Sequence, residues 1–402
     1  MLRMQSPMRP YTLLFAIFAC TLGRAAVALA VIDALANAAP GEFAVGGGLG
    51  PAFCAAGSLI GALALPWLSQ GMALRSLAWL TLLATYGVAT ALWALASSSP
   101  VALLVSIAGL VCCTANIILN YCISMSVYGV DEVVRQKVVV PYISMSFLLA
   151  EAIGPFVAGW LLGNFGLQAI ALLVALAYLV SASLVQGHPK ASFGQPWQGQ
   201  SVTWRSRNPA VTALVMALVV AFGMSWYFSS TLSFLSGQNV SPMLVGSAMS
   251  AVQISAILGA ALAPTLRALP GDRHQHLVLS AMALFPMLLI LQGFFEPRVG
   301  LTTLSGLLLA GSIAGLATML TTAIKFDSVA AHQFARYQSR LSVLTLLGTL
   351  GGASAGAWAV NILGWQMSLL ACVVLCLMIG LWHFTGATPP LKGTEVFHGS
   401  TR

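Results

Sequence analysis

The sequence predicts an all-α polytopic membrane protein, and its composition and its long apolar stretches lead to this fold class. The 402 residues are 59% hydrophobic and only 6% charged, with a mean hydropathy of +0.92. A soluble domain is about a quarter charged, so this chain cannot cover a surface that faces water. We therefore expect the lipid bilayer to surround most of its helices.

Apolar stretches long enough to cross a bilayer recur twelve times along the chain. A helix crosses the ~30 Å hydrocarbon core in about 20 residues. The candidate transmembrane helices lie near 11–35, 47–68, 77–96, 101–126, 139–162, 167–186, 209–235, 243–266, 277–295, 300–324, 341–362 and 367–386. The connectors between them are mostly short, so the prediction is a bundle of twelve helices.

One long polar connector, residues 187–209, divides these spans into two sets of six. The expected domains are an N-terminal six-helix bundle (1–186), a cytoplasmic linker loop (187–208), a C-terminal six-helix bundle (209–386) and a cytoplasmic tail (387–402).

The two halves also resemble each other at a constant spacing. IGALALP at 60–66 precedes LGAALAP at 258–264 by 198 residues, and NFGLQ at 164–168 precedes ILGWQ at 362–366 by the same offset. Two matches at one offset predict an internal duplication. Because each half has an even number of spans, the halves share one orientation and form a 6+6 pseudo-twofold arrangement about the membrane normal.

The distribution of Lys and Arg predicts the orientation in the membrane. If the N-terminus is inside, fifteen basic residues fall in inner segments and only Arg298 falls in an outer connector. We therefore expect a multi-pass protein of a bacterial-type inner (plasma) membrane with both termini cytoplasmic. The net charge of +8 is explained by this asymmetry and does not indicate nucleic acid as a partner.

Several classes of chemistry are not supported by the sequence. The seven cysteines lie in apolar runs without C-x-x-C or metal-ligand spacing, so we expect no metal and no disulfide. The chain contains no G-x-x-x-x-G-K-[ST] phosphate-binding motif and no recognisable nucleophile–base arrangement. The prediction is a protein that is not an enzyme and that needs no cofactor.

The twelve spans, the parallel repeat and the polar central loop together resemble the major facilitator superfamily (MFS). GALALPWLSQGMALR at 61–75 stands where that family has its loop G-x-L-A-D-R-x-G-R-K between spans two and three. Gly61 fits, but Leu65 and Pro66 replace the aspartate and the arginine. The charged gating latch of the family is therefore missing, or it is rebuilt around Arg75.

A second stretch, AEAIGPFVAGWLLG at 150–163, is similar to the Gly-Pro motif of proton antiporters. Gly154, Pro155 and Gly159 carry this likeness, although the upstream glycines are absent. The resemblance implies that spans 1, 4, 7 and 10 line a central cavity and that spans 2, 5, 8 and 11 flank it.

Two charged residues lie within apolar spans, Arg24 in span 1 and Glu151 in span 5. A lone guanidinium at the centre of a membrane helix costs at least ~2.5 to 3.5 kcal/mol, so it needs a partner, water or a ligand. At ~1.5 Å per residue, Arg24 lies about 20 Å and Glu151 about 18 Å from the inner ends of their spans. The two side chains are thus expected at similar depth.

Two readings of this pair follow. Arg24 and Glu151 are either a permanent ion pair that clamps two helices, or groups that meet substrate and protons. In the second reading Glu151 is the proton carrier, because a low dielectric favours the neutral form of a carboxyl group. Arg24 would then anchor an anionic or polar group of the substrate. Asp33, nine residues beyond Arg24, is a reserve proton site near the outer rim.

Other candidate substrate-binding residues are Asn116 and Asn120 in span 4, Gln253 in span 8 and Trp226 in span 7. The amides could equally hold helices together by hydrogen bonds. Trp226 could stack on a ring of the substrate or belong to the aromatic belt of the membrane interface.

Together these observations predict a secondary active transporter that works by alternating access on a small-molecule substrate. The Gly-Pro stretch favours proton-coupled efflux, by antiport, of a drug-like molecule or secreted metabolite. The alternative is a proton symporter that imports a small organic anion or nutrient, which Arg24 would suit equally well. A lipid flippase or membrane sensor on the same fold is the third possibility. We expect a monomer.

Overall fold

The computed structural model describes residues 10–38, 45–71, 107–119, 140–186, 209–237, 241–267 and 334–385, with isolated positions between 79 and 86. All regular structure in these ranges is helical, so the predicted all-α fold class is confirmed. The linker 187–208, the tail 387–402 and the spans predicted near 277–295 and 300–324 lie outside the described residues, as does nearly all of the span near 77–96. The domain boundaries and the membrane orientation stay predictions.

Eight helices of the described part each coincide with one predicted span. They are α1 (Pro10–Ala38), α2 (Val45–Gly71), α6 (Val140–Phe165), α7 (Leu167–Gln186), α8 (Pro209–Gly237), α9 (Pro242–Arg267), α12 (Phe334–Leu363) and α13 (Trp365–Thr385). Residues 107–119, within the fourth predicted span, are also helical. Five of the described helices contain an apolar stretch of 19 to 24 residues, which is long enough to cross a membrane.

The ends of the helices follow from local residue chemistry. Proline occupies the first position of α1, α8 and α9, where its missing N–H leaves no helical bond unmade. Gly166 and Gly364 separate α6 from α7 and α12 from α13, with φ angles of 73° and 79°. Their N–H groups donate to carbonyls four residues earlier, those of Leu162 and Val360. Glycine is favoured at such helix ends because it adopts positive φ without a steric penalty.

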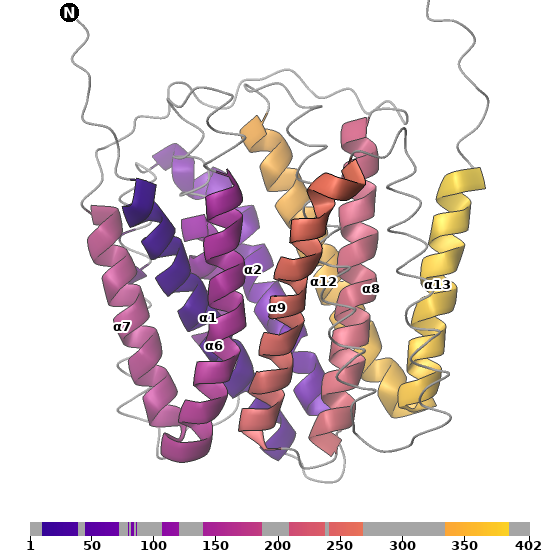
Figure 1. Cartoon of the computed structure of the whole chain (residues 1–402), viewed down its shortest axis with the longest axis horizontal. Helices are drawn as coiled ribbons and strands as arrows, with labels where there is room; N and C mark the ends of the chain where they lie inside the picture. Colours follow the sequence, from indigo (N-terminus) through magenta and orange to yellow (C-terminus); the bar gives the residue numbers. More distant parts are fainter. Residues whose placement is uncertain are drawn as a thin grey trace, which may run out of the picture.

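The 198-residue repeat is visible in these two turns and in how the helices pack. Gly166 and Gly364 are 198 residues apart and have the same backbone conformation. The repeat also relates α1, α2, α6 and α7 to α8, α9, α12 and α13. Packing of α1 on α6 is matched by packing of α8 on α12, and packing of α2 on α12 is matched by packing of α9 on α6 (Figure 1). The last two contacts join the halves.

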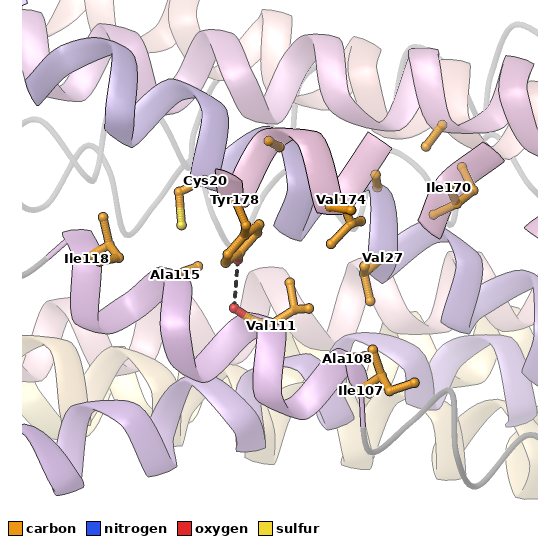
Figure 2. Close-up of a cluster of buried hydrophobic side chains, with 14 of the residues drawn as sticks. Cys20, Val27, Ile107, Ala108, Val111, Ala115, Ile118, Ile170, Val174 and Tyr178 are labelled. Atoms are coloured by element: carbon orange, nitrogen blue, oxygen red, sulfur yellow. Dashed lines mark hydrogen bonds between the residues drawn. The ribbon is translucent and has the colours of Figure 1, made fainter. Parts of the chain in front are cut away.

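The N-terminal half has its hydrophobic core between α1, α7 and residues 107–119. Tyr178 of α7 is fully buried there, and its hydroxyl donates to the carbonyl of Val111 at 2.9 Å (Figure 2). A Cβ on Gly23 would lie 2.8 Å from the Tyr178 ring, so the glycine makes room for it. This packing fixes the segment of α1 that carries Arg24.

The two halves touch near one end of the bundle, which we call the Gly166 end because Gly166 and Gly364 turn the chain there. It is the lower end in Figure 1, toward which α6 and α9 converge. A Cβ on Gly246 of α9 would lie 2.3 Å from the carbonyl oxygen of Pro155 and 3.2 Å from the Cα atom of Gly159. The backbones of α6 and α9 are therefore as close as glycine allows.

Besides its packing on α12, α2 meets α8 of the other half near the same end. The hydroxyl of Ser229 donates to the carbonyl of Gly48. Glycines farther from this end instead contact their own half, since a Cβ on Gly61 would lie 2.6 Å from the carbonyl oxygen of Cys113. Similarly, one on Gly348 would lie 2.5 Å from a carbonyl oxygen of α8. The tight glycine contacts between the halves thus concentrate near the Gly166 end.

Candidate functional site

Arg24 and Glu151 meet near the middle of α1 and α6. The Nε atom of Arg24 donates to Oε1 of Glu151 at 3.2 Å, and Nη2 contacts the same oxygen. The expectation that these two residues lie at the same depth is therefore confirmed. Both contacts use Oε1, so Oε2 of the carboxylate and Nη1 of the guanidinium lie outside the ion pair.

The ion pair is only partly covered, although α1 packs against five other helices. The Arg24 side chain is 22% accessible and that of Glu151 is 15% accessible. The helices α2, α6, α7, α8 and α9 all contact α1. Both side chains therefore keep some accessible surface near the middle of a helix that is packed on several sides.

Glu151 sits at a break in the hydrogen-bonding pattern of α6. Pro155 lies four residues later inside the helix and has no N–H to donate to the Glu151 carbonyl. Gly154 provides the close approach to α1, because a Cβ there would lie 2.7 Å from the Cβ of Ala25. The Gly-Pro pair thus brings the carboxylate against the arginine helix and leaves its backbone carbonyl without the usual helical donor.

Phe147 completes the surroundings of the guanidinium. Its ring centroid lies 5.1 Å from Cζ of Arg24, which is a cation–π distance. Other titratable groups near Arg24 in the described ranges are Cys20 on the same helix and Cys54, Cys112 and Tyr178 on neighbouring helices. Thiols and phenols are ordinarily neutral at pH 7, so among the described residues the local charge is set by Arg24 and Glu151.

The other predicted site residues occupy several different places. Asn116 is buried and donates from Nδ2 to the carbonyl of Ser58 in α2 at 2.6 Å. This contact is the helix-to-helix hydrogen bond that the sequence offered as one of two readings. Gln253 lies partly buried in α9, and Asp33 lies partly buried near the Gly166 end of α1. Asn120 is outside the described residues.

Trp226 lies in α8 and is held by two contacts. Its Nε1 atom donates to Oγ of Ser368 in α13 at 3.1 Å. Its ring meets Phe222 edge to face, with centroids 5.6 Å apart and an interplanar angle of 65°. The indole therefore has a fixed orientation in the middle of the C-terminal half.

The predicted gating residues lie at helix contacts. Gly61 packs against residues 107–119, and Gly159 packs against the start of α9. Arg75 is outside the described residues.

Two residues of the site were not singled out from the sequence. Phe147 stands one helical turn before Glu151, and this i, i+4 spacing is the signal that could have identified it. Tyr178 had no such signal, because a tyrosine in an apolar span is common and its partner is a backbone carbonyl.

Comparison with known proteins identifies the fold. No protein-family model matches the chain, and no characterised protein matches it in sequence. Three solved structures are similar over nearly their whole length. A D-xylose–proton symporter has a TM-score of 0.68 at 12% identity and covers 93% of this chain and 97% of its own. The human organic anion transporter MFSD10 has a TM-score of 0.63 at 16% identity, covering 94% and 100%.

The third is a bacterial homologue of the iron transporter ferroportin in an inward-facing state, with a TM-score of 0.65 at 14% identity, covering 94% and 99%. All three are membrane transporters, and at 12 to 16% identity the likeness shows that this chain shares their fold. The shared fold agrees with the major facilitator fold that the sequence predicted. Because the substrates of these proteins differ in chemistry, the fold does not select one for this chain.

Proposed function

We propose that this protein is a proton-coupled secondary transporter of a small organic anion, with Arg24 as the anchor for the anion and Glu151 as the proton carrier. The observation that carries the proposal is the Arg24–Glu151 ion pair near the middle of α1 and α6, whose two side chains are only partly buried. In this fold type, substrate and coupling-ion sites lie near the membrane midplane between the repeats.

The geometry of the pair favours binding of proton and anion together. While Glu151 is ionised, its Oε1 atom neutralises Arg24. A proton bound at Oε2 removes that negative charge, so the guanidinium becomes available to an anion. An inward proton gradient would then drive uptake of the anion by symport. If a proton on Glu151 raises the affinity for the anion, then by linkage the bound anion raises the affinity for that proton by the same factor.

Proton-coupled efflux is the second candidate, and the Gly-Pro stretch supports it by resemblance. The contacts of that stretch are compatible with either direction, since Gly159 and Pro155 lie where α6 packs against α9. A cation exchanging with the proton at Glu151 would meet the positive charge of Arg24 at close range. For this reason antiport of a cation is disfavoured relative to symport of an anion.

Comparative metabolite analysis of cells and medium tests the direction and names the substrate. A host that expresses the intact chain should accumulate one or more small organic anions from the medium, and the Arg24→Ala variant should lose this accumulation. Equal amounts of both proteins in the membrane are the control. Enrichment of a compound in the medium would favour efflux. Equal transport by the Arg24→Ala variant would assign the ion pair a purely structural role.

A further inference from the structure

The side chains of the two halves differ in chemistry at two pairs of equivalent positions. The 198-residue offset places Phe222 of α8 at the position of Arg24 in α1, and Thr349 of α12 at the position of Glu151 in α6. The same offset aligns Gly154 with Gly352 and Trp160 with Trp358, so it holds through the second halves of α6 and α12. One half thus carries an ion pair where the other carries an aromatic ring and a hydroxyl.

The contacts confirm that Phe222 and Arg24 occupy comparable helix crossings. Arg24 contacts α6 through Glu151, and Phe222 contacts α12, since a Cβ on Gly351 would lie 3.5 Å from its ring. A Cβ on Gly352 would lie 2.0 Å from the backbone carbonyl of Phe222, so this crossing is as close as glycine permits. Each crossing thus has one large side chain near the middle of a helix, Arg24 in α1 and Phe222 in α8.

The C-terminal crossing forms a fixed aromatic surface. Phe222 and Trp226 meet edge to face, and both are partly accessible. Because the indole N–H is already bonded to Ser368, the remaining surface of the two rings is apolar. A pair of rings held in this way favours flat apolar groups.

From this asymmetry we infer that the substrate is an amphiphilic organic monoanion: one carboxylate-like group for Arg24 and one flat, apolar ring system for Phe222 and Trp226. Arg24 and Phe222 hold equivalent positions near the middle of the two halves, and the substrate sites of such repeats lie near the midplane at the interface between the halves. Arg24 and Arg340 are the two cationic side chains whose surroundings the structure describes, and Arg340 lies near the far end of α12. Among the described residues, Arg24 is thus the cationic side chain near the middle of the bundle, and its single positive charge matches a single negative charge. The inference rests on the proposed function.

Binding of matched probes to the purified full-length protein in detergent tests the inference. The probes are 2-naphthoate, the neutral 2-naphthalenemethanol, a 2-naphthylmethylammonium cation and acetate, at equal concentrations. We expect 2-naphthoate to bind at least about tenfold more tightly than each of the others, as judged by Trp fluorescence and thermal stabilisation. Equal binding of the neutral or cationic analogue, equal binding of acetate, or no binding of 2-naphthoate up to millimolar concentration would overturn it.

Two variants assign the two ends of the probe. Arg24→Gln should remove the preference for 2-naphthoate over 2-naphthalenemethanol. Phe222→Leu keeps an apolar side chain but removes the ring, so it should weaken 2-naphthoate about three- to tenfold and leave acetate unchanged. Trp358→Leu is the matched control, because Trp358 is 59% exposed. An unchanged affinity of Phe222→Leu for 2-naphthoate would contradict the aromatic half of the inference.

Measuring proton uptake during probe binding tests the substrate class and the proposed proton coupling separately. Binding of 2-naphthoate that depends on Arg24 and Phe222 but takes up no proton would support the substrate class and refute the proton coupling. Proton-coupled binding of acetate alone would do the reverse.

Discussion

Replacement of Arg24 by glutamine is expected to destabilise the protein by about 3–5 kcal/mol near neutral pH, because it leaves the Glu151 carboxylate charged and unpaired within the bundle. Glu151→Gln should be destabilised comparably, because it leaves the guanidinium of Arg24 charged and unpaired in the same place. Thermal unfolding of both variants in detergent measures these effects.

The double variant Arg24→Gln/Glu151→Gln is the control for this prediction. It removes both charges together, so we expect it to regain most of the stability that either single variant loses. We also expect it to have no proton-coupled transport. A double variant that is stable and still transports with proton coupling would show that the coupling lies elsewhere, for example at Asp33.

Substitution of Gly246 by alanine is expected to reduce transport strongly without unfolding the protein. The added Cβ would lie 2.3 Å from the backbone oxygen of Pro155, so α6 and α9 must separate at the Gly166 end. An alternating-access cycle needs that end to close, and the variant should therefore stay open there. We expect a decrease in transport of at least about tenfold, since packed backbones cannot absorb this overlap.

Thiol labelling distinguishes an open end from general damage. Val245 is 7% exposed and adjoins Gly246. A cysteine in place of Val245 should therefore react slowly with a thiol reagent when Gly246 is present, and rapidly when Gly246→Ala is added. The experiment uses a chain whose native cysteines are replaced. Gly163→Ala is the matched control, because a Cβ there would meet nothing within 4 Å. Slow labelling with normal transport in the Gly246→Ala protein would contradict the prediction that α6 and α9 must close at the Gly166 end during transport.

The sequence predicted the described spans well because bilayer thickness sets both the length and the hydrophobicity of a spanning helix. The predicted bounds fail where a helix extends beyond the apolar core. The eleventh span was predicted from residue 341, whereas α12 begins at Phe334 and includes the polar residues that precede the apolar stretch. A span prediction based on hydropathy leaves these polar residues out, although the helical backbone continues through them.

The heights of Arg24 and Glu151 along their spans could also be predicted, and the two side chains do meet in the structure. The direction of each side chain around its helix could not. A helix that is apolar on all sides has no periodicity to report which face meets which neighbour. For this reason the contact of Asn116 with α2 and the ring of Phe147 beside the guanidinium became evident only from the packing.

The exchange of protons on substrate binding tests the central claim most directly. Purified protein is titrated with the compound identified by metabolite analysis, and the proton count is taken from binding heats in buffers of different ionisation enthalpy. Joint binding of proton and anion predicts that the native chain takes up protons and that Glu151→Gln takes up none. Release of protons on binding would instead mean that substrate and proton compete, and would contradict the symport account in favour of antiport.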